Sequence, residues 1–161
     1  KLTDPFCLFY LHFVKHQGKA NEKYWQQNTV SPSIVSWRGF AFEQVCFNHI
    51  EQIKHALGIS GVITTHSAWS KKDDDKDGMQ IDLLIERSDN VINMCEIKFT
   101  SNDFAVDKSY YRVLLSRPEM LLERVSPKIS IRSTLITTYG LKHNEYSGAF
   151  TNVITLDDLF W

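Results

Sequence analysis

The chain has 161 residues, of which 43% are hydrophobic and 23% are charged, and its formal net charge is −1. This length suits one domain with a substantial core and a small appendage. A net charge so close to zero excludes a general attraction to nucleic acid or to an anionic membrane, so any contact with a polyanion must come from a local patch. No run of 18 apolar residues is present, so no membrane span is predicted.

The three cysteines, Cys7, Cys46 and Cys95, lie in apolar settings without the spacing of a disulfide pair or a metal site. They are typical of small buried side chains in a reducing compartment, so we expect a cytoplasmic protein. The sequence begins at Lys1 instead of a methionine and shows no signal peptide. We therefore expect it to be a piece of a longer chain.

The first predicted element is a helix that begins at Asp4-Pro5, within an N-terminal helical segment and connection over 1–33. Its aromatic side chains recur at helical spacing, which is typical of core packing or of a seam between domains. The predicted domain over 34–161 follows. It opens with a helix over 36–57 and a β-branched strand over 61–70.

The order of the predicted elements along the domain is helix, strand, hairpin, helix, strand. After the first strand they are a charged loop over 71–78, a hairpin over 79–99, a helix over 107–124 with its cap in 101–103, a strand over 129–138, and a tail over 153–161 with a short strand and a helical turn.

The predicted hairpin carries charges where its neighbours are apolar. Asp82 interrupts one strand, and Glu96-Ile97-Lys98 interrupts the next. Side chains alternate along a strand, so Gln80 and Asp82 share one face and their odd-numbered neighbours take the other. A three-residue turn that ends at Asn90 sets Asp82 opposite Glu96, and Gln80 opposite Lys98, on that face.

Two interpretations of this carboxylate pair stay open. Like charges directly opposite one another destabilise an ordinary sheet. A divalent cation between them reverses the sign of that effect, and carboxylate oxygens suit Mg²⁺ or Mn²⁺. The alternative is a solvated strand face that carries ordinary surface charges.

Glu43 is a candidate third carboxylate. It lies three residues after Phe40 and four before Phe47, in the apolar stripe of the second predicted helix. A carboxylate there can join Asp82 and Glu96 directly or through water. The alternative is a side chain at the edge of the stripe that reaches solvent.

The helix over 107–124 interleaves basic and aromatic residues, which can contact phosphates or stack on bases. The alternative is an amphipathic helix with a solvated basic face. Its members are Lys108, Tyr110, Tyr111, Arg112, Arg117 and Arg124, and we expect Lys108, Tyr111 and Arg112 to contact nucleic acid. The chain has no Gly-x-x-x-x-Gly-Lys-Ser/Thr motif, so no nucleotide site is expected in it.

Asp82, Glu96-Ile97-Lys98 and the helix-borne Glu43 together resemble the PD-(D/E)XK nuclease superfamily, although Ile81 replaces the usual proline. Nearly the whole chain also resembles the C-terminal domain, of unknown function, of archaeal-type P-loop ATPases. The stretches that carry this second resemblance are Leu2-Thr3-Asp4-Pro5-Phe6, Gly39-x-x-Phe42-Glu43, Gln80-Ile81-Asp82-Leu83-Leu84, Cys95-Glu96-Ile97-Lys98-Phe99, Tyr139-Gly140-Leu141-x-x-Asn144 and Leu156-Asp157-Asp158-Leu159-Phe160.

The resemblance implies an α/β fold with a restriction-endonuclease-like αβββαβ core, in which helices flank a mixed central sheet. It also implies Mg²⁺-dependent hydrolysis of phosphodiester bonds. Asp82, Glu96 and the Ile97 carbonyl would hold the metal, Lys98 would orient the attacking water, and Glu43 would support a metal. Gln80 would line the site.

Three functions remain open at this stage. The first is a metal-dependent DNA nuclease domain appended to an ATPase portion that is missing from this chain. The second is a catalytically silent DNA-binding module of the same fold. The third is a regulatory or interaction domain whose N-terminal helix docks on the ATPase, and a homo-oligomer is compatible with each.

Overall fold

A computed structural model describes residues 4–15, 23–71, 79–123 and 125–160 of the chain. The chain divides into two compact units, Lys1–Asn48 and His49–Trp161, and each is described by itself. The predicted boundary between residues 33 and 34 falls inside the first unit. The predicted charged loop lies outside the described residues except for Lys71, and so does Arg124.

The N-terminal unit is helical. Helix α1 (Pro5–Phe9) starts as predicted, because the Asp4 carboxylate accepts hydrogen bonds from two amides of the first turn. A π-helical segment, η1 (Tyr10–Val14), continues it, and α2 (Tyr24–Asn28) and α3 (Pro32–Asn48) follow. Helix α2 lies where the sequence predicted only a connection.

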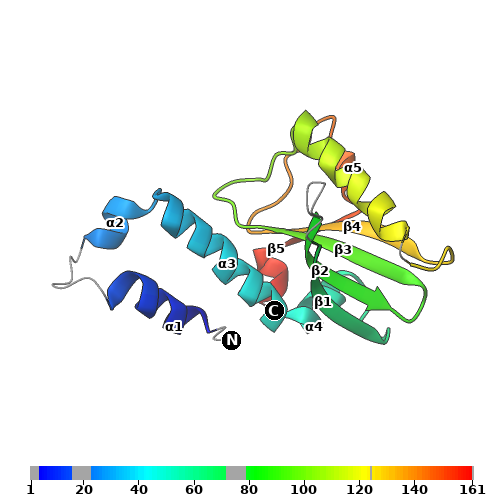
Figure 1. Cartoon of the computed structure of the whole chain (residues 1–161), viewed down its shortest axis with the longest axis horizontal. Coiled ribbons are helices and arrows are strands. Elements are labelled where there is room, and N and C mark those ends of the chain that lie inside the picture. Colours follow the sequence, from blue (N-terminus) through cyan, green and yellow to red (C-terminus); the bar gives the residue numbers. More distant parts are fainter. Residues whose placement is uncertain (1–3, 16–22, 72–78, 124, 161) are drawn as a thin grey trace. The chain divides into compact units, whose positions relative to one another are not determined.

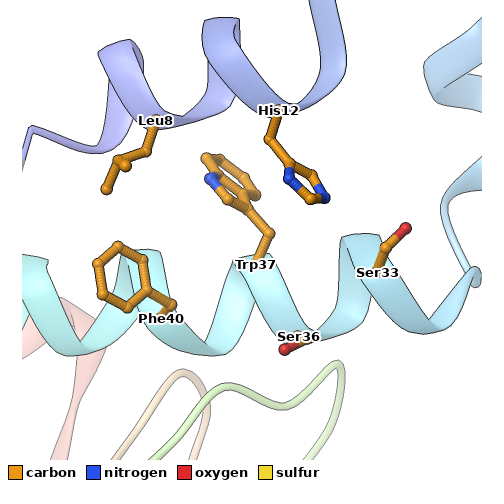
Figure 2. Close-up of a pocket in the computed structure, with 6 residues that line it drawn as sticks. All are labelled: Leu8, His12, Ser33, Ser36, Trp37 and Phe40. Carbon is orange, nitrogen blue, oxygen red and sulfur yellow. The ribbon is translucent and has the colours of Figure 1, made fainter.

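The aromatic stripe of α1 packs against α3, as its helical spacing indicated. The ring centroid of Trp37 lies 5.1 Å from that of Phe9 and 6.1 Å from that of Phe13. Beside these rings is a pocket of about 560 Å³ (Figure 2). It is lined by Leu8, His12, Ser33, Ser36, Trp37 and Phe40. Phe6, by contrast, is 74% exposed.

The second unit is built on a five-stranded mixed sheet in the order β1-β2-β3-β4-β5 (Figure 1). The first three strands pair antiparallel, and β3, β4 and β5 pair parallel. Parallel neighbours need a crossover, which α5 (Lys108–Leu122) provides between β3 and β4. The strands are β1 (Thr64–Lys71), β2 (Met79–Arg87), β3 (Val91–Lys98), β4 (Ser130–Thr137) and β5 (Asn152–Thr155).

Helices cover both faces of this sheet. Helix α5 lies along one face (Figure 1), where Leu114 packs with Leu135 and Leu121 packs with Met94. On the other side, α4 (Ile50–Ala56) contributes buried isoleucines, and η3 (Leu156–Leu159) packs against it. The central strand β3 is accordingly buried on both faces. The fold is therefore mixed α/β with a flanked mixed sheet, as predicted.

Two helix boundaries differ from the prediction. The helix expected over 36–57 is interrupted at His49, whose φ of −118° and ψ of 34° separate α3 from α4. Helix α5 is capped by Asp107, whose carboxylate accepts from the Tyr110 amide at 2.8 Å, and not by a residue of 101–103. Among the described helices, none has the length and apolar character needed to cross a membrane.

Candidate functional site

The site begins with the hairpin of β2 and β3, which has the register that the sequence predicted. Asn90 takes the left-handed conformation, with a φ of 64°, in the three-residue turn. The ladder then pairs residues as far as Leu83 with Cys95, and the predicted pairs of Asp82 with Glu96 and of Gln80 with Lys98 lie beyond its last pair.

On its other edge, β2 contains a bulge at Asp82. The pairs on either side of the bulge are Ser67 with Leu84 and Trp69 with Ile81, so one residue of β1 faces two residues of β2. A bulge breaks the alternation of side chains. As a result, Ile81 packs in the same core cluster as Leu84, beneath α5.

This bulge corrects the predicted position of Gln80. Strict alternation placed Gln80 on the face of Asp82 and Glu96, and Ile81 on the other face. Because Ile81 lies on the α5 side, alternation turns Gln80 away from it, and the Gln80 side chain is exposed. The structure therefore does not bring Gln80 to the carboxylate pair.

Asp82 is held at the junction of β2 and β3. Beyond the last ladder pair, the Ile97 amide donates to the Asp82 carboxylate at 2.9 Å. Burial, and then the neighbouring charge of Glu96, raise the pKa of Asp82 above its ordinary value. The Ile97 amide and the charges of Lys98 and Arg117 oppose that increase in pKa. These opposing effects show that Asp82, Glu96, Lys98 and Arg117 share one electrostatic environment.

Glu96 is the most enclosed charge of this group, with an exposed fraction of 6%. Lys98 Nζ lies 2.5 Å from its Oε1 atom, and the Tyr110 hydroxyl donates to the same oxygen. Arg117 Nη1 forms an ion pair with the other oxygen, Oε2. A buried carboxylate is tolerated when it is paired in this way.

Tyr110 and Arg117 were not among the site residues predicted from the sequence. They lie seven positions apart on α5, with Leu114 between them and Leu121 after them, so all four follow the buried stripe of the helix. This helical phase could have identified them, by the same argument that selected Glu43. The residues selected on this helix from the sequence were instead Lys108, Tyr111 and Arg112.

The residues predicted to contact nucleic acid are not among the side chains described in contact with Glu96. Lys108 and Arg112 are exposed on α5. Tyr111 is half-buried, and its ring lies 5.3 Å from that of Tyr146 in an apolar cluster. Tyr111 therefore packs against the domain and is not a freely projecting aromatic side chain.

Lys98 contacts Glu96 and also lines a pocket at the start of α5. Its Nζ lies 5.8 Å from the centre of the Tyr110 ring, over the face of that ring. Both residues line a pocket of about 350 Å³, so the donors to Glu96 border an open space. The remaining lining residues are Phe104, Ala105, Asp107, Ser109 and Val113.

The oxygen donors fit a magnesium-type cation in their chemistry. Asp82 and Glu96 offer carboxylate oxygens and Ile97 offers a carbonyl, and Mg²⁺ is commonly held by one or two carboxylates with water completing its shell. Within the described ranges, no three His, Cys, Asp or Glu side chains are grouped for a metal. Glu43 belongs to α3 in the other unit, so its predicted contribution stays a prediction.

Comparison with known proteins gives no family for this chain. No family model matches it, and no curated protein matches it. Among solved structures, it is similar to the crystal structure of a protein of unknown function, AF1548, with a TM-score of 0.45 and 14% identity. The similarity covers 68% of this chain and 56% of that one, so the chain spans little more than half the length of that protein.

Proposed function

We propose that this chain carries a Mg²⁺- or Mn²⁺-dependent phosphodiesterase site that cuts DNA, in a domain appended to a P-loop ATPase. The observation that supports the proposal is the meeting of Asp82, at the bulge of β2, with the segment of β3 that carries Glu96 and Lys98. The order of strands, with a helical crossover after β3, is compatible with a restriction-endonuclease-like αβββαβ core.

In this proposal, Asp82, Glu96 and the Ile97 carbonyl hold the cation, and Glu43 supports it from α3. A bound cation supplies an acidified water and offsets charge on the phosphate oxygens. Lys98 borders the open pocket, so its ammonium can orient the attacking water and donate to a phosphate oxygen. Lys108 and Arg112 are exposed on α5 and would contact the DNA backbone.

A specific observation favours a second candidate, a catalytically silent DNA-binding or regulatory module of the same ATPase. Both carboxylate oxygens of Glu96 already accept from side chains, namely Lys98, Tyr110 and Arg117. A carboxylate satisfied in this way can serve a purely structural purpose. The net charge of −1 also agrees with the regulatory form of this candidate, which needs no general attraction to DNA.

The deciding experiment is cleavage of single-stranded, duplex and branched DNA with Mg²⁺ or Mn²⁺. The nuclease proposal predicts that EDTA abolishes cutting and that Lys98→Ala lowers the rate by about 10²–10³, the usual cost of a lost electrostatic donor. Asp82→Ala should remove detectable cutting. The exposed Lys142→Ala is the matched control and should cut like the wild type.

Equal background cutting by the wild type and both site variants, all folded, contradicts the nuclease proposal. DNA binding that EDTA does not affect, without cutting, favours the silent DNA-binding module. Absence of DNA affinity together with tight association with the ATPase portion favours the regulatory module.

A further inference from the structure

Arg117 brings a fixed positive charge to the carboxylate pair. Its Nη1 atom is bonded to Oε2 of Glu96, and its side chain is only 17% exposed. The guanidinium therefore pairs with Glu96, one of the two carboxylates that would hold a cation.

The other donors to Glu96 do not duplicate this role. Lys98 and Tyr110 both bond Oε1, and both line the open pocket. Arg117 alone, among the contacts described for Glu96, bonds Oε2. A cation that binds both carboxylates must therefore compete with the guanidinium. Two positive charges at the same buried carboxylate oxygen repel each other, because little water is present to screen them.

We infer that Arg117 is a positioning residue, the resident counter-ion of Glu96, and that it leaves Glu96 when a divalent cation binds. The inference rests on the proposed function, because it takes the carboxylate pair to be a cation site. This competition is reciprocal. A bound cation weakens the Arg117–Glu96 pair, and the pair weakens the binding of the cation by the same factor. The released guanidinium is then a donor for a substrate phosphate oxygen.

Magnetic resonance of the arginine side chains in the wild-type protein tests this exchange directly. In the cation-free protein, the guanidinium protons of Arg117 should exchange slowly with water because they are paired and enclosed. Addition of Mg²⁺ should shift these signals and speed their exchange. Unchanged Arg117 signals, while the amides around Asp82 and Glu96 respond to Mg²⁺, would overturn the inference.

The affinity for Mn²⁺ gives a second, independent measurement. Arg117→Gln should bind Mn²⁺ about tenfold more tightly than the wild type, or more, measured from the free Mn²⁺ signal in electron paramagnetic resonance. Without the cation, Arg117→Gln should have a lower melting temperature than the wild type, because Glu96 loses a partner. Added Mn²⁺ should raise the melting temperature of this variant by more than that of the wild type. Arg132→Gln, which removes an exposed arginine of β4, should bind Mn²⁺ like the wild type.

Two further variants separate failure of the inference from failure of the proposed function. If Asp82→Asn and Glu96→Gln abolish Mn²⁺ binding but Arg117→Gln leaves it unchanged, the cation site stands and the counter-ion role is wrong. If Mn²⁺ binds equally to all of these variants, the carboxylate pair is not the cation site and both fail. Should Arg117→Gln not fold, the Mg²⁺ titration of the wild type decides the question.

Discussion

At the scale of single residues, the unusual feature of this domain is Glu96, a buried carboxylate whose two oxygens are both paired with donor side chains. Glu96 points from the central strand toward α5, where Lys98, Tyr110 and Arg117 meet it. Its negative charge and burial raise the pKa of the Tyr110 hydroxyl, with burial the larger effect. Tyr110 therefore stays a hydrogen-bond donor at physiological pH.

Asp82 yields a stability prediction. Its pKa is raised in the folded protein, so the ionised carboxylate that exists at neutral pH destabilises the fold. Asp82→Asn keeps an acceptor for the Ile97 amide and removes the charge. We expect this variant to be more stable than the wild type at pH 7 by about 0.5–2 kcal/mol, a usual gain when a strained functional group is replaced.

The advantage of Asp82→Asn should depend on pH with a definite sign. The pKa of Asp82 is higher in the folded protein than in the unfolded chain, so the wild type recovers stability as the pH falls through the folded value. The free energies of unfolding of the two proteins should therefore converge near pH 3.8, the ordinary pKa of this group. Urea unfolding between pH 3.5 and 7.5 measures this. A constant difference, or one no larger than that of the exposed Asp157→Asn, would contradict the assigned environment.

The residue scale also shows what the sequence could reveal about the site. The approach of Asp82 to Glu96 followed from local chemistry, the turn at Asn90 and the alternation of β3. The position of Gln80 did not follow from local chemistry, because it depends on the bulge in β2, and the pairing of β2 with β1 sets that bulge. A register between distant strands is fixed by the packing of the whole sheet.

At the scale of elements, α5 is what encloses the carboxylate pair. Leu114 and Leu121 anchor it on the sheet on either side of Arg117 in the sequence, each buried in its own apolar cluster. Pro118 lies inside the helix and removes one backbone donor from it, so backbone hydrogen bonds alone hold this part of α5 less firmly. The packing of the two leucines holds the segment that presents Tyr110 and Arg117.

Truncation of Leu114 tests this anchoring. Leu114 is 2% exposed, so Leu114→Ala should destabilise the protein by about 2–5 kcal/mol. Its neighbour Leu115 is 51% exposed, and Leu115→Ala should change the free energy of unfolding by less than about 0.5 kcal/mol. Denaturant unfolding measures both, and similar costs for the two would show that α5 does not face the sheet as described.

The elements themselves were mostly predictable. The hairpin, the strand after α5 and the cap at Asp4 have strong local signals in turn residues, β-branched runs and N-cap chemistry. The interruption at His49 was missed because apolar residues at helical spacing, Phe47, Ile50 and Ile53, continue through it. The cap of α5 was misplaced because 101–103 and Asp107 offer similar side chains.

At the scale of the whole molecule, the residues predicted for the site are divided between the two units. Asp82, Glu96, Lys98 and Arg117 belong to the sheet-bearing unit, whereas Glu43 belongs to the helical unit. The sequence could propose Glu43 from its helical phase alone. Its distance from the carboxylate pair depends on tertiary arrangement, which helical periodicity does not encode.

Crystals of the whole chain grown with MnCl₂ would show whether Asp82 and Glu96 form one divalent-cation site. We expect an anomalous-scattering peak within coordination distance of both carboxylates, with the Arg117 guanidinium moved off Glu96. A contribution from Glu43 would be visible in the same map. A fully ordered site with no peak between the carboxylates, and Arg117 still paired with Glu96 in excess Mn²⁺, would contradict it.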